Sequence, residues 1–368
     1  DCASREDLSF VIDEMIAELN VGHAYNRGNP DLEDEPSESV GMLGVDFELH
    51  DGAFRVRKIY RGAPWDYDAR SPLDALPPDK LEEGDYILAV NREPLDAGKD
   101  PWAAFVGLAG KTVTLTVSDE PEMNEQTRDV NVKLISSEGG LRYRDWIEQN
   151  RAYVDKKTDG QVGYIYVPNT AAEGNNDLFR QFYGQTQKKA LIVDERWNGG
   201  GYIPIRMIEL LNRPVLNYWA RRDGKDGSTP QDGHFGPKCM LINSLSASGG
   251  DAFPSYFRQV GLGKLIGIRT WGGLIGYTGG PSLIDGGRVI APSFAFYDLD
   301  GTWGIEGHGV DPDIEVIDDP TLMANGGDPQ LDAAIELMMQ EIKSHPYIPP
   351  KRPPYPDRSG MGIREEDK

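Results

Sequence analysis

The feature that most constrains the fold is a repeated alternation of strand-like and helix-like segments in the second half of the chain. The apolar strand-like runs span residues 162–167, 190–194 and 239–243, and helical patterns follow them near residues 176–183, 203–211 and 253–260. Repeated strand–helix pairs are typical of βαβ crossovers and a parallel sheet. The sequence therefore predicts an α/β domain in this half.

The region from residue 39 to residue 137 has a different pattern. Apolar and polar residues alternate with a period of two in Phe54–Ile59, Tyr86–Val90 and Thr112–Val117, and only one short helix is expected, near residues 102–108. Such alternation predicts β-strands. Helices are expected at residues 7–20 and 140–153 on either side. The predicted division is a helical segment at 1–38, a β domain at 39–137, an α/β domain at 138–345 and a Pro-rich tail at 346–368.

Charge and cysteine content limit the class of protein. The formal net charge is −22, which argues against nucleic acid because that partner requires a basic surface. No apolar run approaches the ~20 residues that span a bilayer, so no membrane association is expected. The two cysteines, Cys2 and Cys239, make a disulfide framework unexpected. A cytoplasmic location is the expectation, and further N-terminal domains are left open.

A small-residue turn at residues 244–250 is the first candidate for chemistry. It follows the apolar run 239–243 and precedes a helical pattern, and it places Ser248 next to Gly249. A tight turn exposes a serine hydroxyl, and the start of a helix offers free N–H groups to a developing oxyanion. On local evidence alone, serine and glycine at such a strand-to-helix turn are more often only a turn and a helix cap.

A glycine run, Gly199–Gly201, follows the apolar run 190–194. Consecutive glycines let the backbone approach a ligand closely and direct N–H groups toward it. A phosphate loop is unsupported, because no Lys-Ser or Lys-Thr pair follows. An oxyanion hole and a flexible turn both remain open. Five histidines could supply a base: His23, His50, His234, His308 and His345. His23 and His308 are the favoured candidates.

Together, seven motifs in order resemble the C-terminal half of the tricorn proteases, within the wider family of C-terminal processing peptidases. They are LNVGHAY (19–25), GMLGVDF (41–47), EGDYILAVN (83–91), VDERWNGGG (193–201), SLSASGGDAFP (244–254), GIRTWGGLIG (267–276) and IEGHGVDPDIEV (305–316). The resemblance covers residues 8–340. It implies a helical segment, a PDZ domain and a crotonase-like catalytic domain of ββα superhelical type.

The resemblance also implies residue roles. Ser248 would be the nucleophile, His23 the general base and Glu306 the carboxylate that completes a relay. The N–H of Gly249 and one N–H of the glycine run, that of Gly200 or Gly201, would form the oxyanion hole. Leu43, Gly44 and Val45 resemble the loop with which PDZ domains bind a peptide carboxylate, although a structural or gating role is the alternative. No metal and no cofactor are expected.

Two departures from the family pattern bear on mechanism. Gly22 occupies the position at which the tricorn proteases carry a relay serine, so either a water fills the gap or Glu306 reaches His23 directly. In the Ser-Lys branch of the family a lysine lies in a Thr-x-Gly-Lys-Gly motif, and Gly273 occupies that position here. The departure at Gly273 favours a histidine base over a lysine base.

The leading hypothesis is a cytoplasmic serine endopeptidase that cleaves oligopeptides and forms a homo-oligomer. The alternatives are a non-catalytic peptide-binding scaffold with a relic site, a C-terminal processing protease acting on intact proteins, and an acyl-CoA enzyme of the same fold class. Acidic residues at Asp223 and Asp226 suggest a preference for basic side chains at the cleavage site.

Overall fold

A computed structural model describes residues 2–28, 37–62, 66, 69–77, 80–355 and 364–367. These residues form two compact units, which are described separately. The first comprises Asp1–Phe10, Gly28–Tyr153 and Ile284–Gly287, and the second comprises Val11–Arg27, Val154–Leu283 and Arg288–Lys368. The predicted four-part division remains a prediction, and the expected loop before residue 39 and the Pro-rich tail lie partly outside the described residues.

The first unit is built on an antiparallel sheet with strand order β2-β3-β4-β6-β7, in which β5 pairs with β4. Its strands are β2 (Val45–His50), β3 (Ala53–Ile59), β4 (Tyr86–Val90), β5 (Glu93–Pro94), β6 (Thr112–Ser118) and β7 (Arg128–Lys133). The strands predicted at residues 54–59, 86–90 and 112–117 are confirmed as β3, β4 and β6. Burial alternates clearly in β7, where Val130 and Val132 are buried and their neighbours are exposed, whereas most of β4 and β6 is buried. The predicted short helix is a 3-10 helix, η3 (Pro101–Phe105), and a second, η1, spans Pro72–Ala75.

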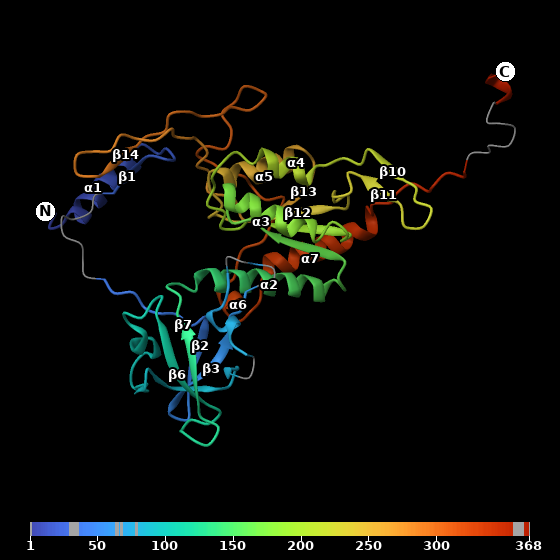
Figure 1. Ribbon diagram of the computed structural model, residues 1–368. Coiled ribbons are helices and arrows are strands. Elements are labelled where there is room, and N and C mark those ends of the chain that lie inside the picture. Colours follow the sequence, from blue (N-terminus) through green and yellow to red (C-terminus); the bar gives the residue numbers. More distant parts are fainter. Residues whose placement is uncertain are drawn as a thin grey trace. The chain divides into compact units, whose positions relative to one another are not determined.

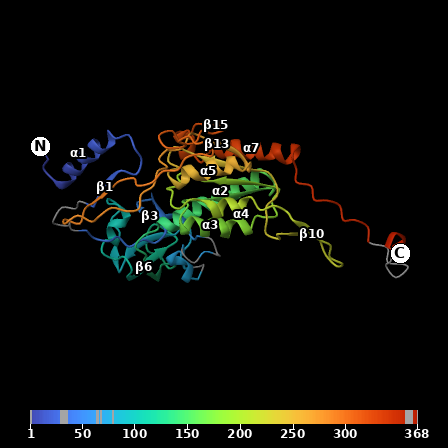
Figure 2. The ribbon, with the colours of Figure 1, turned by 90° about the horizontal axis from the view of Figure 1, so that it is seen from above.

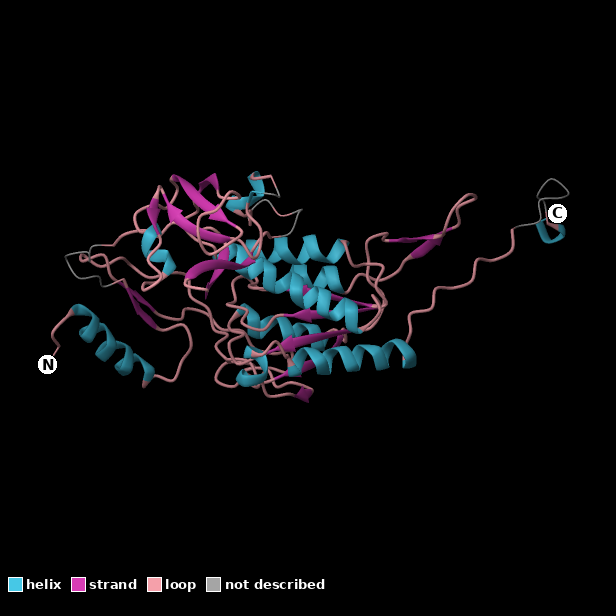
Figure 3. Cartoon of the chain, turned by 90° about the horizontal axis from the view of Figure 1, so that it is seen from below, coloured by secondary structure: helices cyan, strands magenta, loops and turns pink. Residues whose placement is uncertain are grey.

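The second unit contains a five-stranded parallel sheet with strand order β15-β13-β12-β9-β8. Its strands are β8 (Val162–Tyr166), β9 (Ala190–Asp194), β12 (Lys238–Ile242), β13 (Gly263–Gly267) and β15 (Ile314–Glu315). The helices α3 (Ala172–Tyr183), α4 (Ile205–Leu211) and α5 (Gly249–Gln259) cover one face, and α7 (Pro329–Ser344) covers the other (Figures 1 and 2). Figure 3 shows helices along both faces of this sheet. The predicted α/β domain is confirmed.

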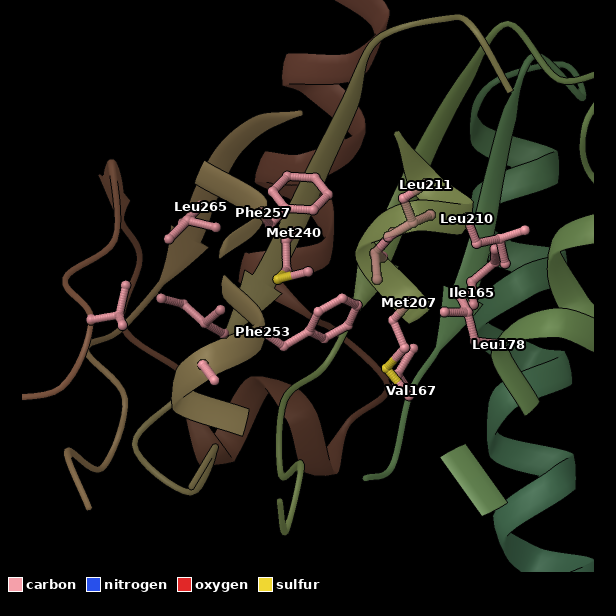
Figure 4. Packing of buried hydrophobic residues seen from close by; sticks show 14 of the residues in the cluster. Ile165, Val167, Leu178, Met207, Leu210, Leu211, Met240, Phe253, Phe257 and Leu265 are labelled. Carbon is pink, nitrogen blue, oxygen red and sulfur yellow. The ribbon is translucent and has the colours of Figure 1, made fainter. Parts of the chain in front are cut away.

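Burial explains why the three predicted strands have continuous apolar runs. All residues of β8, β9 and β12 are buried, as expected where helices cover both faces of a sheet. Phe253 and Phe257 of α5 pack with Met240 of β12 in the core shown in Figure 4. This packing fixes α5 on the sheet and therefore fixes the turn before it.

The remaining elements are short or peripheral. They are α1 (Arg5–Ala17), α2 (Gly139–Lys157), α6 (Pro320–Ala324), the 3-10 helix η5 (Glu365–Asp367), and two antiparallel pairs, β1 (Tyr25–Arg27) with β14 (Arg288–Ile290) and β10 (Asn217–Trp219) with β11 (Gly227–Thr229). Both helices predicted at residues 7–20 and 140–153 are present. The apolar side chains of α1 do not form a core, because none of its residues is buried. Within the described ranges, no helix is long and apolar enough to cross a membrane.

A buried arginine connects β9 to α7. The Arg196 side chain is 0% exposed, and its guanidinium donates to Asp194 (2.7 Å) and to Asp328 (2.7 Å). A buried cation is tolerated only when carboxylates and hydrogen bonds compensate for lost hydration. Here two carboxylates do so, and the backbone that leads into the glycine run is thereby anchored to the start of α7.

Candidate active site

Ser248 lies in the sharp turn between β12 and α5, in the second unit. Its backbone angles are φ 58° and ψ −112°, a region that side-chain-bearing residues rarely adopt. Asn243 holds the turn, because its Oδ1 accepts N–H groups from Leu245 (3.1 Å) and Trp197 (3.0 Å). The helix begins at Gly249 rather than near residue 253, so Ser248 is the residue that immediately precedes the first helical turn.

The glycine run lies against this turn. Gly200 and Gly201 have φ values of 81° and 138°. A Cβ atom on Gly200 would come within 2.6 Å of the Ala247 carbonyl oxygen and 2.8 Å of Ser248 Cβ. One on Gly201 would come within 2.6 Å of the Ala171 nitrogen. Both positions therefore require glycine, for backbone conformation as well as for space.

The N–H groups of the run have different partners. Gly199 donates to the Pro168 carbonyl (3.1 Å), and Gly200 donates to Asn198 Oδ1 (2.9 Å). Within the described part of the chain, the N–H groups of Gly201 and Gly249 have no protein acceptor. A Cβ atom on Gly249 would be 3.1 Å from the Gly201 nitrogen, so the two residues are close neighbours. Of the two candidates left open by the sequence, Gly201 has the available donor.

His23 is half-buried within a group of aromatic rings. Its ring centroid lies 6.0 Å from that of Tyr25, 5.9 Å from Trp271 and 5.7 Å from Tyr277. Burial lowers the pKa of His23, while the charges of Glu306 and Asp251 partly offset this effect. Its Nδ1 atom is buried without a hydrogen-bond partner among the described residues. No hydrogen bond joins the ring to Ser248 or Glu306 in this structure.

The Glu306 carboxylate accepts hydrogen bonds from backbone N–H groups and none from the His23 ring. Its Oε1 accepts the Gly22 N–H at 2.7 Å, and its Oε2 accepts the N–H groups of Leu274 (2.7 Å) and Ile275 (3.0 Å). A Cβ atom on Gly22 would lie 3.1 Å from Oε1. Glu306 therefore contacts the residue directly before His23, and the absence of a side chain at Gly22 permits this close approach.

The other histidines have separate surroundings. His308 is exposed and its Nε2 lies 2.7 Å from Asp311. Burial lowers the pKa of His234 to about 3, and the positive charge of Lys238 adds to the effect. His50 contacts the Tyr86 hydroxyl at 2.6 Å, in the first unit, and His345 contacts Glu341 at 2.8 Å. Of the five histidine side chains, only that of His23 lies close to the other residues proposed for the site around Ser248.

Two buried acids near the turn were not identified as site residues from the sequence. Asp251 accepts the Ser248 N–H at 2.6 Å, and its position three residues after Ser248 is a capping-box signal that the sequence does contain. Glu195 is 0% exposed, and neither of its carboxylate oxygens has a hydrogen-bond partner among the described residues. Burial raises its pKa well above the usual range; Ser246 acts in the opposite direction, and the negative charges of Asp251 and Asp194 add to the rise.

The loop expected to bind a peptide carboxylate is engaged within the first unit. The Gly44 N–H donates to Glu138 Oε2 at 3.0 Å. Leu43 and Val45 are both 0% exposed. A Cβ atom on Gly44 would lie 2.8 Å from a methyl group of Leu141. The Gly44 amide, which would receive a peptide carboxylate, is therefore already bound to the carboxylate of Glu138. This favours a structural role for the loop.

Comparison with known proteins identifies two domains. The family model of the tricorn protease PDZ domain matches residues 41–137, and that of peptidase family S41 matches residues 161–316. The crystal structure of the tricorn protease superimposes with a TM-score of 0.85 at 34% identity, over 93% of this chain and 33% of that chain. The PDZ-like β domain and the peptidase domain predicted from the sequence are thereby confirmed.

Several curated proteins match almost the whole chain. Tricorn protease homolog 1 of Streptomyces coelicolor is 37% identical over 95% of this chain and 33% of the relative. Tricorn protease of Thermoplasma acidophilum is 34% identical over 96% and 32%, respectively. A putative tricorn-like protease C-terminal subunit of Sulfurisphaera tokodaii is 36% identical over 93% and 39%. The chain thus spans about a third of the length of these relatives. It is a homologue of the tricorn proteases, with a tricorn-type PDZ domain followed by a family S41 peptidase domain.

Proposed function

We propose that the chain is the catalytic part of a serine endopeptidase that cleaves oligopeptides through an acyl-enzyme. The observation that carries the proposal is the setting of Ser248. A strained serine at the head of α5 lies beside two unpaired backbone amides, in a domain that matches peptidase family S41. Backbone strain of this kind is concentrated at functional sites. His23 also has a positive φ, of 57°.

In the proposed reaction, Ser248 Oγ attacks the carbonyl carbon of the scissile peptide while His23 accepts the hydroxyl proton. His23 then gives this proton to the leaving amine as the C–N bond breaks, which leaves an ester on Ser248. Water then attacks the carbonyl carbon of the ester while His23 accepts a proton from it. His23 returns this proton to Ser248 Oγ as the C–O bond breaks and the carboxylic acid product leaves. Because no hydrogen bond joins Ser248 and His23 in this structure, the two side chains have to approach each other when substrate binds. Catalytic hydrogen bonds are often long before that step.

Glu306 is proposed to support the base in two ways. It fixes the backbone at Gly22, and its negative charge raises the pKa of His23 against the effect of burial. Since the imidazolium forms during acylation, a nearby carboxylate stabilises the transition state more than the ground state. Direct contact between Glu306 and the His23 ring is not required for this effect.

The N–H groups of Gly249 and Gly201 are proposed to form the oxyanion hole. Replacing Gly201 by alanine is expected to lower kcat by about 10²–10³-fold, the usual effect of losing one such donor. The alanine would have to leave φ 138° and move away from Ala171, which displaces the amide. Steady-state kinetics with a fluorogenic peptide would measure the loss.

Gly199→Ala is the matched control for that experiment. A Cβ atom at Gly199 would meet no atom within 4 Å. Its φ is not in the positive range, so alanine fits without strain. We expect near-normal kcat for this variant. Equal losses from Gly199→Ala and Gly201→Ala would show that the whole loop is merely sensitive to added bulk, and the oxyanion assignment would fail.

Substrate class and assembly are inferred from the relatives. Oligopeptide substrates, a homo-oligomer and a cytoplasmic location form part of the proposal because the matched relatives are tricorn proteases. A preference for basic side chains would rest on Asp223, because Asp226 forms an ion pair with Arg352. A peptide-binding scaffold with a relic site is the main alternative.

Fluorophosphonate labelling tests the proposal. The probe reacts with activated serines, so intact protein should gain one phosphonyl group, and peptide mapping should locate it on Ser248. Cleavage of a mixed oligopeptide library should occur in the same preparation. Folded protein that is neither labelled nor active on peptides would support the scaffold instead. Cleavage of intact proteins but not of peptides would indicate a processing protease.

A further inference from the structure

Asp251 is a fully buried carboxylate to which several groups donate hydrogen bonds. Its Oδ2 accepts the Ser248 N–H at 2.6 Å, and its Oδ1 accepts the Thr270 hydroxyl at 2.5 Å and the Gly272 N–H at 2.8 Å. Burial raises the pKa of Asp251, while these hydrogen bonds act in the opposite direction. Because every contact is with a donor, the carboxylate is bound as an anion.

The segment from Thr270 to Ile275 is held by this carboxylate at one end and by Glu306 at the other. Asp251 binds Thr270 and Gly272, and Glu306 binds the amides of Leu274 and Ile275. Trp271, within the segment, also donates its backbone N–H to the Ser246 carbonyl at 2.9 Å. Two anions therefore define the path of six consecutive residues beside the proposed site.

This segment connects the backbone of the proposed nucleophile with that of the proposed base. At one end, the Ser248 N–H donates to Asp251, which also binds the start of segment 270–275. At the other end, the Gly22 N–H donates to Glu306, which also binds the end of that segment. The Trp271 ring, carried by the same segment, is one of the rings around His23. The residues bearing the two reacting groups lie more than 200 positions apart in the chain, so their spacing depends on such contacts.

We propose that Asp251 is a positioning residue that sets the spacing between Ser248 and His23 by tying the nucleophile's backbone to segment 270–275. The proposal rests on the function proposed above. Asp251 does not touch substrate, and it acts through the backbone of Ser248 and through Trp271. Its charge has a second consequence, because it raises the pKa of His23 together with the larger contribution of Glu306.

Asp251→Asn tests the proposal, because asparagine has the same shape but places an NH₂ group against bound donors. We expect the second-order rate of fluorophosphonate labelling to fall about 10–100-fold, as for loss of a group that orients a catalytic residue. For peptide cleavage, kcat should fall while KM changes little. The acidic limb of the labelling rate should also move to lower pH, because His23 loses a nearby negative charge.

Thr270→Val and Thr270→Ser separate positioning from charge. Valine removes the hydrogen bond that Thr270 donates to Asp251, while the negative charge of Asp251 remains. Labelling should therefore slow, and the acidic limb of the labelling rate should not shift. Serine keeps the hydroxyl and should restore the rate. This pair remains informative if Asp251→Asn does not fold: a wild-type rate for Thr270→Val would then overturn the proposal.

The outcomes are distinct from failure of the proposed function. If the wild-type protein is not labelled on Ser248, the peptidase proposal itself fails. If it is labelled, and folded Asp251→Asn reacts at the wild-type rate or keeps the wild-type acidic limb, Asp251 has only a structural role and this inference is wrong.

Discussion

Replacing Ser248 by alanine is expected to lower kcat about 10⁶-fold, the effect of removing the nucleophile from a serine peptidase. The residual rate would come from substrate binding and the oxyanion donors. Fluorophosphonate labelling should vanish in the same variant. Continuous peptide assays, with urea denaturation to confirm folding, measure both effects.

Ser244→Ala provides the matched control, because Ser244 is an exposed serine in the same turn. We expect it to retain wild-type labelling and kcat. If Ser248→Ala keeps its activity, or if Ser244→Ala loses it, the nucleophile has been assigned to the wrong residue.

The same position should show a conflict between stability and activity. The φ of 58° and ψ of −112° at Ser248 cost about 1–3 kcal/mol for a residue with a side chain. Glycine adopts such angles freely, although it costs ~0.5–1 kcal/mol of extra unfolded-state entropy. Inactive Ser248→Gly should therefore be more stable to urea than inactive Ser248→Ala. The reverse order would mean that the turn is not strained.

Local patterns predicted three strands of each sheet: β3, β4 and β6 in the first, and β8, β9 and β12 in the second. β9 has the bounds that the apolar run indicated, and β8 and β12 differ by a residue at their ends. β13 and β15 were not predicted, since β13 begins and ends with glycine and β15 has only two residues. These strands exist because the neighbouring strand provides backbone partners, and no local pattern records that.

The start of α5 was placed too late for a related reason. Gly249 and Gly250 have low helix propensity, so the helical pattern becomes visible only near Phe253. In the folded chain the Asp251 carboxylate binds the Ser248 N–H, and tertiary packing of α5 on the sheet completes the first turn. A capping interaction thus outweighs the poor propensity of two glycines.

The candidate site could be predicted as a set of residue types, but its contacts could not. The motifs indicate a serine, a histidine, a glutamate and glycines. The choice between Gly200 and Gly201 depends on whether Asn198 takes one amide, and the role of Glu306 depends on Gly22 lying against it. Both are contacts between backbone and side chain, and in the case of Glu306 the partners are distant in sequence.

Replacing His23 by alanine is expected to be as damaging as losing Ser248, about 10⁶-fold in kcat, because the nucleophile and its base act as one unit. The double variant Ser248→Ala/His23→Ala should then be no slower than either single variant. His308→Ala, which removes an exposed histidine paired with Asp311, is the control and should retain full activity. Loss of activity in His308→Ala but not in His23→Ala would reverse the assignment of the base.

The pH dependence gives an independent test of the same residue. His23 must be neutral to accept a proton, and burial lowers its pKa below 6.5. As pH falls, the midpoint of the decline in kcat/KM should therefore lie below pH 6.5. Glu306→Gln removes the charge that opposes this lowering, so its acidic limb should lie at still lower pH while its maximal rate is reduced. An acidic limb above pH 6.5, or one that Glu306→Gln moves upward, would mean that another group titrates and that Glu306 does not act on the base through its charge.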